Sequence, residues 1–199
     1  MATPDGAFIG GVPKVNRHHT NPWKDGAVTT HVGRRCCVLV AVQRNLRSDV
    51  GEFLNNHYHG KGTFKYANGD IYNGQFQEGQ YEGQGNYLFA NGDNYIGTYK
   101  DNKQSGRGLF VYANGDRYEG EFKNDKFNGQ GSLLFKSGNK YVGQFHDGRP
   151  DGQGTYTFRN GDVYKGAFKR GDKHGEGIET YGDGRPKRQG QWKSGQFIG

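Results

Sequence analysis

The sequence predicts an all-β fold, an elongated single-layer antiparallel β-meander of tandem 23-residue hairpin repeats that follows an irregular N-terminal extension. Two observations predict the meander: aromatic residues and glycines recur every 23 positions, and within a repeat they alternate with the period of two that is typical of β-strands. Composition agrees, because only 31% of the 199 residues are apolar, yet the chain has 36 glycines, 13 tyrosines and 13 phenylalanines. A disordered chain would be poor in aromatic residues.

The repeat keeps its register without an insertion through the middle of the chain. In the repeat pattern a glycine lies two positions after a tyrosine, and an aromatic residue lies two positions after that glycine. Six residues then separate this aromatic residue from a Gly-x-Gly pair. We expect six full units and a final half unit over residues 48–199. The predicted structural positions are Tyr72, Gly74, Phe76, Gly83, Gly85, Tyr95, Gly97, Tyr99, Gly106, Gly108, Tyr118, Gly120, Phe122, Gly129, Gly131, Tyr141, Gly143, Phe145, Gly152, Gly154, Tyr164, Gly166, Phe168, Gly175 and Gly177.

Turns and glycines within a unit have predicted roles. Asn-Gly pairs at 68–69, 91–92, 114–115 and 160–161 favour two-residue hairpin turns, and a second turn is expected near Glu78–Tyr81. Glycine leaves a gap across which a neighbouring ring can lie, so we expect both glycines of each pair to accept rings. On that basis a valine at Gly106 or Gly129 would overpack the sheet.

Residues 1–47 lack the period and are predicted to be a separate basic extension. They carry +5 of the formal net charge of +7, so the repeats are nearly balanced. Two interpretations stay open: a solvated tail, or an arm that docks on an acidic surface such as tubulin, a phosphoinositide membrane or nucleic acid. The run Cys36–Val42 favours a buried strand, with reduced thiols rather than S-acylation. The candidate basic arm consists of Lys14, Arg17, Lys24, Arg34, Arg35, Arg44 and Arg47.

Nothing in the sequence indicates an enzyme. The Gly-x-Gly pairs lack the strand–helix context of a nucleotide site, and no nucleophile elbow is present. His57 and His59 could share one side of a strand, but they have no cysteine or carboxylate partners at matching positions. We therefore predict no catalytic, cofactor-binding or metal-ligating residues, and no cofactor.

The pattern Tyr-x-Gly-x-Phe, six residues, then Gly-x-Gly resembles the MORN repeat over about residues 48–199. The array departs from the repeat at three positions. Asp49 and either Lys187 or Arg188 stand in place of tyrosine, and Glu179 stands in place of another ring. These departures indicate that the two ends of the array are less regular than its middle. The resemblance implies a curved single-layer sheet and a non-catalytic role, since MORN proteins tether partners at membranes or cytoskeletal structures and several build radial spokes. We therefore expect a cytoplasmic scaffold or docking protein of a cytoskeletal assembly, the axoneme of a cilium or flagellum. The alternative is a membrane tether that binds anionic phospholipid through the basic arm and the repeat surface.

One aliphatic set lies on the strand positions opposite the rings. We interpret it as a protein-binding surface, although β-branched residues on a solvated face can also reflect strand propensity alone. The expected partners are other proteins of a large assembly, with a second MORN array or a homodimer as further options. Nucleic acid is not expected, because the rings that could stack on bases would be buried. The set is Leu88, Ile96, Leu109, Val111, Leu134 and Val142.

Overall fold

The computed structural model describes residues 36–37, 50–55 and 57–199, and every regular element in these ranges is a β-strand. All the strand pairings described are antiparallel, so the predicted fold class is confirmed. The strands are β1 (Cys36–Cys37), β2 (Val50–Leu54), β3 (His57–Lys65), β4 (Ile71–Gln77), β5 (Gln80–Leu88), β6 (Asn94–Lys100), β7 (Lys103–Val111), β8 (Arg117–Lys123), β9 (Lys126–Leu134), β10 (Lys140–His146), β11 (Arg149–Thr157), β12 (Val163–Lys169), β13 (Asp172–Thr180), β14 (Pro186–Lys193) and β15 (Gln196–Phe197).

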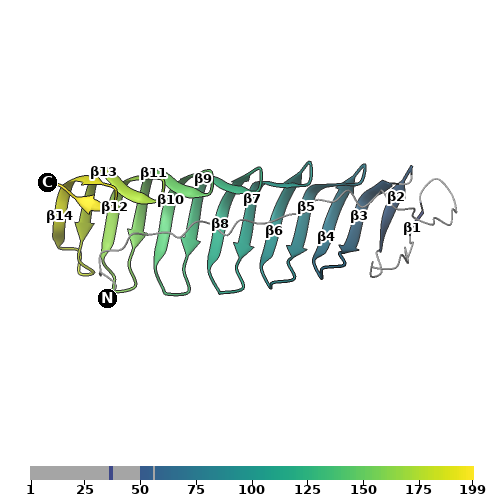
Figure 1. Cartoon of the computed structure of the whole chain (residues 1–199), viewed down its shortest axis with the longest axis horizontal. Coiled ribbons are helices and arrows are strands. Elements are labelled where there is room, and N and C mark those ends of the chain that lie inside the picture. Colours follow the sequence, from purple (N-terminus) through teal and green to yellow (C-terminus); the bar gives the residue numbers. More distant parts are fainter. Residues whose placement is uncertain (1–35, 38–49, 56) are drawn as a thin grey trace. The chain divides into compact units, whose positions relative to one another are not determined.

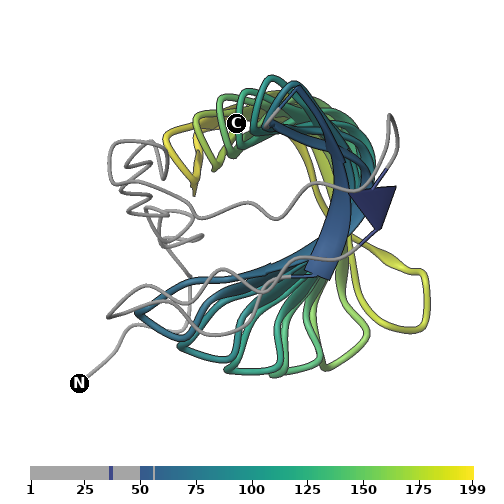
Figure 2. The same cartoon turned by 90° about the vertical axis from the view of Figure 1, so that its right-hand side faces the viewer.

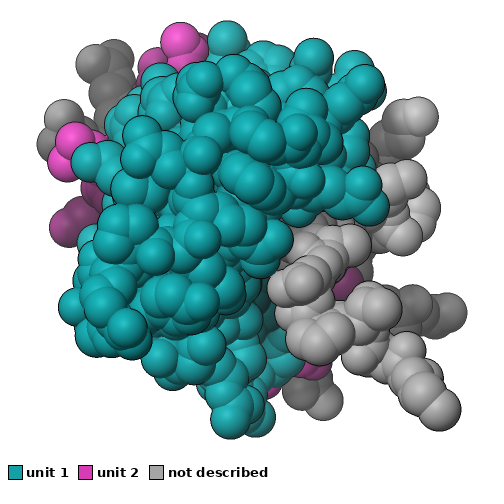
Figure 3. Space-filling view, turned by 90° about the vertical axis from the view of Figure 1, so that its left-hand side faces the viewer, with its two compact units in different colours: residues 1–14, 114–199 teal, residues 15–113 magenta. Residues whose placement is uncertain are grey.

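The described chain forms two compact units that divide between Ala113 and Asn114 (Figure 3). One unit holds β1–β7 and the other holds β8–β15, and in each the strands follow one another in chain order (Figure 1). Within each unit the successive hairpins trace nearly the same curved path (Figure 2). Each unit is thus an open single-layer meander, in which a hairpin contacts only its neighbours in the sequence.

A tyrosine that lies over a pair of glycines is the repeated packing motif. Gly97 of β6 and Gly108 of β7 are directly opposite each other, and the Tyr95 ring covers them. A Cβ added to Gly108 would lie 2.6 Å from Tyr95 Cε2, so any side chain there would displace the ring. The Tyr95 hydroxyl donates a hydrogen bond to the Thr98 carbonyl oxygen at 2.9 Å. The equivalent tyrosines, all fully buried, are Tyr72, Tyr118, Tyr141 and Tyr164.

Within each unit, tyrosines of this set also join neighbouring repeats. The Tyr118 ring stacks on Phe127 with centroids 3.6 Å apart, and it meets the edge of Phe145 in the next repeat at 5.0 Å. Tyr72 makes the same two kinds of contact in the other unit, with Tyr81 at 3.6 Å and Tyr99 at 5.3 Å. The side of the sheet that carries these residues is called the ring face below. Because each ring is covered only when the next hairpin is present, the repeat cannot bury its core alone.

The predicted assignment of the two-residue turns was wrong. The tight turns join β4 to β5 and its equivalents, for example at Glu78–Gly79 and at Asp101–Asn102, and both residues of each have positive φ. Five residues, in contrast, separate β3 from β4, and Asn68 there accepts a hydrogen bond from the Asp70 amide at 3.0 Å. The sequence misled because Asp and Asn tolerate the left-handed conformation, so the tight turns need no Asn-Gly pair.

The two glycines of each pair turn out to have different roles. Gly106 has φ of +64° and lies at a register shift of the β6–β7 pair, where an added Cβ would meet only the Thr98 side chain at 3.6 Å. Gly129 has φ of +62° and faces the Glu121 carboxylate. The expectation that rings pack on Gly106 and Gly129 was therefore wrong, since these glycines are needed for backbone conformation.

Substitutions can separate the two roles. We expect Gly108→Asn to lower the free energy of unfolding by about 1–3 kcal/mol, because its side chain overlaps the Tyr95 ring. Gly106→Asn should cost less than about 1 kcal/mol, since asparagine tolerates positive φ and the site has room. Urea denaturation of both variants is the measurement. Equal destabilisation would contradict this division of roles.

The buried tyrosines also predict a dependence of stability on pH. Burial, with a contribution from the Glu179 charge, raises the pKa of Tyr164 to about 12, whereas an unfolded tyrosine has a pKa of about 10. The unfolded chain therefore loses the phenolic proton first. The stability that this group contributes is complete below pH of about 10 and is lost as the pH rises toward 12.

Denaturant unfolding between pH 8 and 11, followed by tyrosinate absorbance, should show this loss. The Tyr164→Phe variant should lose less stability over the same range, because one titrating group is gone. An identical slope for the variant and the natural chain would show that Tyr164 does not contribute.

Candidate functional site

Within residues 50–55 and 57–199, and at Cys36 and Cys37, no three His, Cys, Asp or Glu side chains come together as metal ligands would. No helix in the same part of the chain has the length and hydropathy to cross a membrane.

An apolar patch lies opposite the ring face on β4–β7. Ile96 is directly opposite Leu109, and Ile71 is directly opposite Leu88. Val111 is opposite Asn94 and is therefore a diagonal neighbour of Ile96. Leu88 and Ile96 keep 43% and 47% of their surface exposed, and the other three are half-buried. We call these five residues the apolar patch.

Polar side chains border the patch and are tied to one another. Asn73 donates a hydrogen bond to the Thr63 hydroxyl at 2.6 Å, and Gln84 donates one to the Thr98 hydroxyl at 2.9 Å. An apolar centre with a hydrogen-bonded polar margin has the anatomy of a protein interface.

The structure brings together four of the six aliphatic residues predicted from the sequence: Leu88, Ile96, Leu109 and Val111. Leu134 and Val142 belong to the other unit, where Leu134 lies between Arg117 and Lys140, and Val142 is opposite Ser132 and Thr155. Ile71 was missed, because its equivalents in the next repeats are Asn94, Arg117 and Lys140 and no aliphatic period marks the position.

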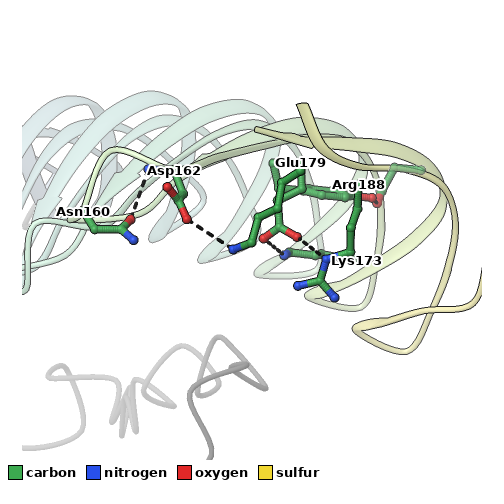
Figure 4. Close-up of polar contacts among 8 residues, drawn as sticks. Asn160, Asp162, Lys173, Glu179 and Arg188 are labelled. Atoms are coloured by element: carbon green, nitrogen blue, oxygen red, sulfur yellow. Dashed lines mark hydrogen bonds and ion pairs between the residues drawn. The ribbon is translucent and has the colours of Figure 1, made fainter. Parts of the chain in front are cut away.

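A charged cluster replaces the rings in the last full repeat (Figure 4). Glu179 is only 4% exposed, and its carboxylate lies 3.3 Å from Lys173 Nζ and 3.1 Å from Arg188 Nε. Lys173 Nζ also lies 4.5 Å from the centre of the Trp192 ring and 4.9 Å from that of Tyr164. Positions equivalent to those of Glu179 and Arg188 hold rings such as Tyr156 and Tyr141, whereas the position of Lys173 holds rings such as Phe127 but also Gln104 and Pro150.

The second predicted site, the basic arm, is not tested. Lys14, Arg17, Lys24, Arg34, Arg35, Arg44 and Arg47 all lie outside the described residues. Of the run Cys36–Val42, only β1 is described, and it pairs with β2 through Cys36 opposite Phe53 and Cys37 opposite Glu52. The boundary predicted near residue 48 is also outside the described residues.

Comparison with known proteins gives one family match. A model of the MORN repeat matches residues 50–71, 72–94, 95–117, 118–140, 141–163 and 164–184 in unbroken succession. No curated protein matches the chain. Among solved structures, the chain is similar to the SAS-4 (dCPAP) TCP domain in complex with a proline-rich motif of Ana2 (dSTIL) from Drosophila melanogaster, with 12% identity, 83% of this chain and 96% of that chain covered, and a TM-score of 0.39. Similarity at this level implies nothing about a ligand.

The charged cluster yields a stability prediction. Glu179→Ala should lower the free energy of unfolding by about 3 kcal/mol, because two cations would stay beside the rings without their carboxylate. The combined variant Lys173→Phe, Glu179→Tyr, Arg188→Tyr restores rings and should equal or exceed the natural chain in stability. The melting temperatures of the natural chain and of both variants, measured by thermal unfolding, test these two expectations.

Asp183→Ala is the matched control. It breaks the ion pair with Arg185, which is exposed, so it should cost less than about 1 kcal/mol. If Glu179→Ala is as mild as Asp183→Ala, the cluster does not stabilise the last repeat.

Proposed function

We propose that this chain, which belongs to the MORN-repeat family, is a non-catalytic scaffold that docks a partner protein on the apolar patch. The observation that carries the proposal is the set of aliphatic side chains gathered across β4–β7, with Leu88 and Ile96 nearly half exposed. Among residues 50–55 and 57–199, no second layer covers this face of the sheet. Apolar side chains that adjoin one another in such a position are typical of an interaction surface.

Strand propensity alone does not account for the patch. Ile96 and Leu109 are equivalent to Glu119 and Ser132 one repeat later, and those residues form the same antiparallel pair, β8 with β9. The fold therefore accepts polar residues at these positions. The aliphatic residues are consequently available for a role other than building strands.

A cytoskeletal assembly is the place that we propose for the scaffold, with the axoneme of a cilium or flagellum as the specific site. This part of the proposal is supported by the roles of other MORN proteins. The alternative is a membrane tether, and it is supported by the charge of residues 1–47, which carry +5 of the total of +7.

Fractionation of cells that express the tagged full chain tests the patch. The natural chain should stay with the detergent-insoluble cytoskeleton, and the double variant Ile96→Ser, Leu109→Ser should be released from it. The melting temperature of this variant should change by only a few degrees, because polar residues occupy the equivalent strand pair one repeat later. Leu134→Ser with Val142→Ser is the matched control, because these two side chains are each 44% exposed.

The control variant should fractionate like the natural chain. If both pairs of substitutions have the same effect, the patch is not the docking surface. Extraction of the natural chain by detergent would favour the membrane tether instead, and binding through the basic arm would then weaken with salt.

A further inference from the structure

We infer that the unit Asn114–Gly199 has a second docking surface, for an extended acidic peptide of a partner protein. It is a row of basic side chains at the end of the sheet that carries the five-residue turns. The row, called the basic rim, consists of Arg117, Lys136, Lys140 and Arg159, all of them exposed. This inference does not depend on the apolar patch, which belongs to the other unit.

Charge is distributed unevenly over the repeats. Residues 50–113 contain 5 Lys and Arg against 6 Asp and Glu, whereas residues 114–199 contain 15 against 11. The near balance of the whole array thus hides a net charge of −1 in one part and +4 in the other. The basic character of this protein is therefore shared between residues 1–47 and the unit that begins at Asn114.

The fold does not require basic residues at the rim. The position of Lys136 and Arg159 is filled by Ala67, Ala90 and Ala113 in the earlier repeats. Likewise, the position of Arg117 and Lys140 is filled by isoleucine and asparagine at 71 and 94. Since the same turns and strands form with neutral residues, the positive charge has another role.

The backbone of the rim is held in place by hydrogen bonds between repeats. The Lys136 amide donates to Asp116 Oδ1 at 2.9 Å, and the Arg159 amide donates to Asn139 Oδ1 at 2.8 Å. The other Asp116 carboxylate oxygen accepts from Asn114 at 2.9 Å. The side chains therefore start from fixed points, which lowers the entropy lost when a ligand binds.

Most of this charge has no carboxylate partner in the described part of the chain. Arg117 lies 3.6 Å from Glu119 in an exposed pair, which is worth little. Lys136, Lys140 and Arg159 have no carboxylate within 4.0 Å among residues 50–55 and 57–199. Three cations are therefore available to an anionic ligand.

The spacing of the rim identifies the shape of the ligand. Arg117 and Lys140 lie on either side of Leu134, each directly opposite it, so they are two strands apart, about 9.6 Å. Lys136 and Arg159 are separated by one repeat, which is the same interval. A polyproline II segment rises about 9.3 Å per turn of three residues and presents every third side chain to one side. A carboxylate at every third residue would thus meet successive cations.

An acidic peptide fits this row better than a continuous polyanion. The carboxylates of Asp116 and Glu119 interrupt the rim, so an anionic lipid surface or a nucleic acid would place negative charge against them. A peptide with spaced carboxylates avoids that repulsion. Acidic segments also populate the polyproline II conformation when unbound, so binding does not require them to fold.

Fluorescence anisotropy with the full chain at low salt tests the inference. The probes are a labelled peptide of five Glu-Pro-Pro triplets and a peptide of the same composition with its five glutamates adjacent. We expect the periodic peptide to bind more tightly. The double variant Lys136→Ala, Arg159→Ala should bind the periodic peptide about tenfold more weakly, which is the effect of losing two exposed ion pairs. It should still fold, because alanine occupies this position in three other repeats.

Two controls separate the rim from net charge and from the patch. Lys123→Ala with Lys169→Ala removes two exposed cations from the tight-turn ends of β8 and β12, and should change binding less than twofold. Ile96→Ser with Leu109→Ser should leave peptide binding unchanged even where it abolishes docking on the patch.

Three results would overturn the inference. Equal loss in the rim and control pairs would show that only net charge matters. Equal binding of the two peptides would show that spacing does not matter. Binding to phosphatidylserine vesicles that depends on Lys136 and Arg159, without binding of either peptide, would identify a lipid surface as the ligand.

Discussion

The close contact between a tyrosine ring and a pair of glycines on adjacent strands is the constraint on which each repeat depends. Gly97 lies opposite Gly108, so neither strand has a Cβ atom at this point and the Tyr95 ring lies directly against the backbone. The ring must also reach the carbonyl of Thr98 with its hydroxyl. A tyrosine and two glycines at fixed separations satisfy both conditions, and this accounts for a repeat that keeps its register.

The same contact explains why the repeats occur in series. Each ring is covered by the next hairpin, as Phe145 covers Tyr118, so every hairpin leaves one ring to be covered by its successor. After Tyr164, the cover consists of Trp192 and the Lys173 ammonium group instead of a further stacked ring. Glu179 lies beside Lys173 and Arg188, so charged groups take part in the packing between the last full repeat and β14.

The periodic part of this structure could be predicted from the sequence because period two and period 23 report directly on strands and on repeats. Features that depend on the backbone angle φ could not be predicted from the sequence. Gly106 and Gly108 look alike in the sequence, but only the structure shows that one is needed for a positive φ and the other for space. The register between neighbouring strands could not be predicted from the sequence either. Ile71 joins Leu88 through pairing. The sequence showed the departures at Glu179 and at Lys187 or Arg188, but not that Lys173 and Arg188 would both contact Glu179.

Function in this protein should be sought in residues that break the period. The ring face is constrained by packing, so most of its positions hold rings or glycines, although Gln104, Leu133 and Pro150 replace rings outside the charged last repeat. The opposite face and the turns are free of that constraint, and there the repeats differ: Ile96 is followed one repeat later by Glu119, and Ala113 by Lys136. A regular core thus lets neighbouring repeats carry an apolar patch in one unit and a basic rim in the other, on the same backbone. Departures that the fold does not require are consequently the more informative signal of what each repeat binds.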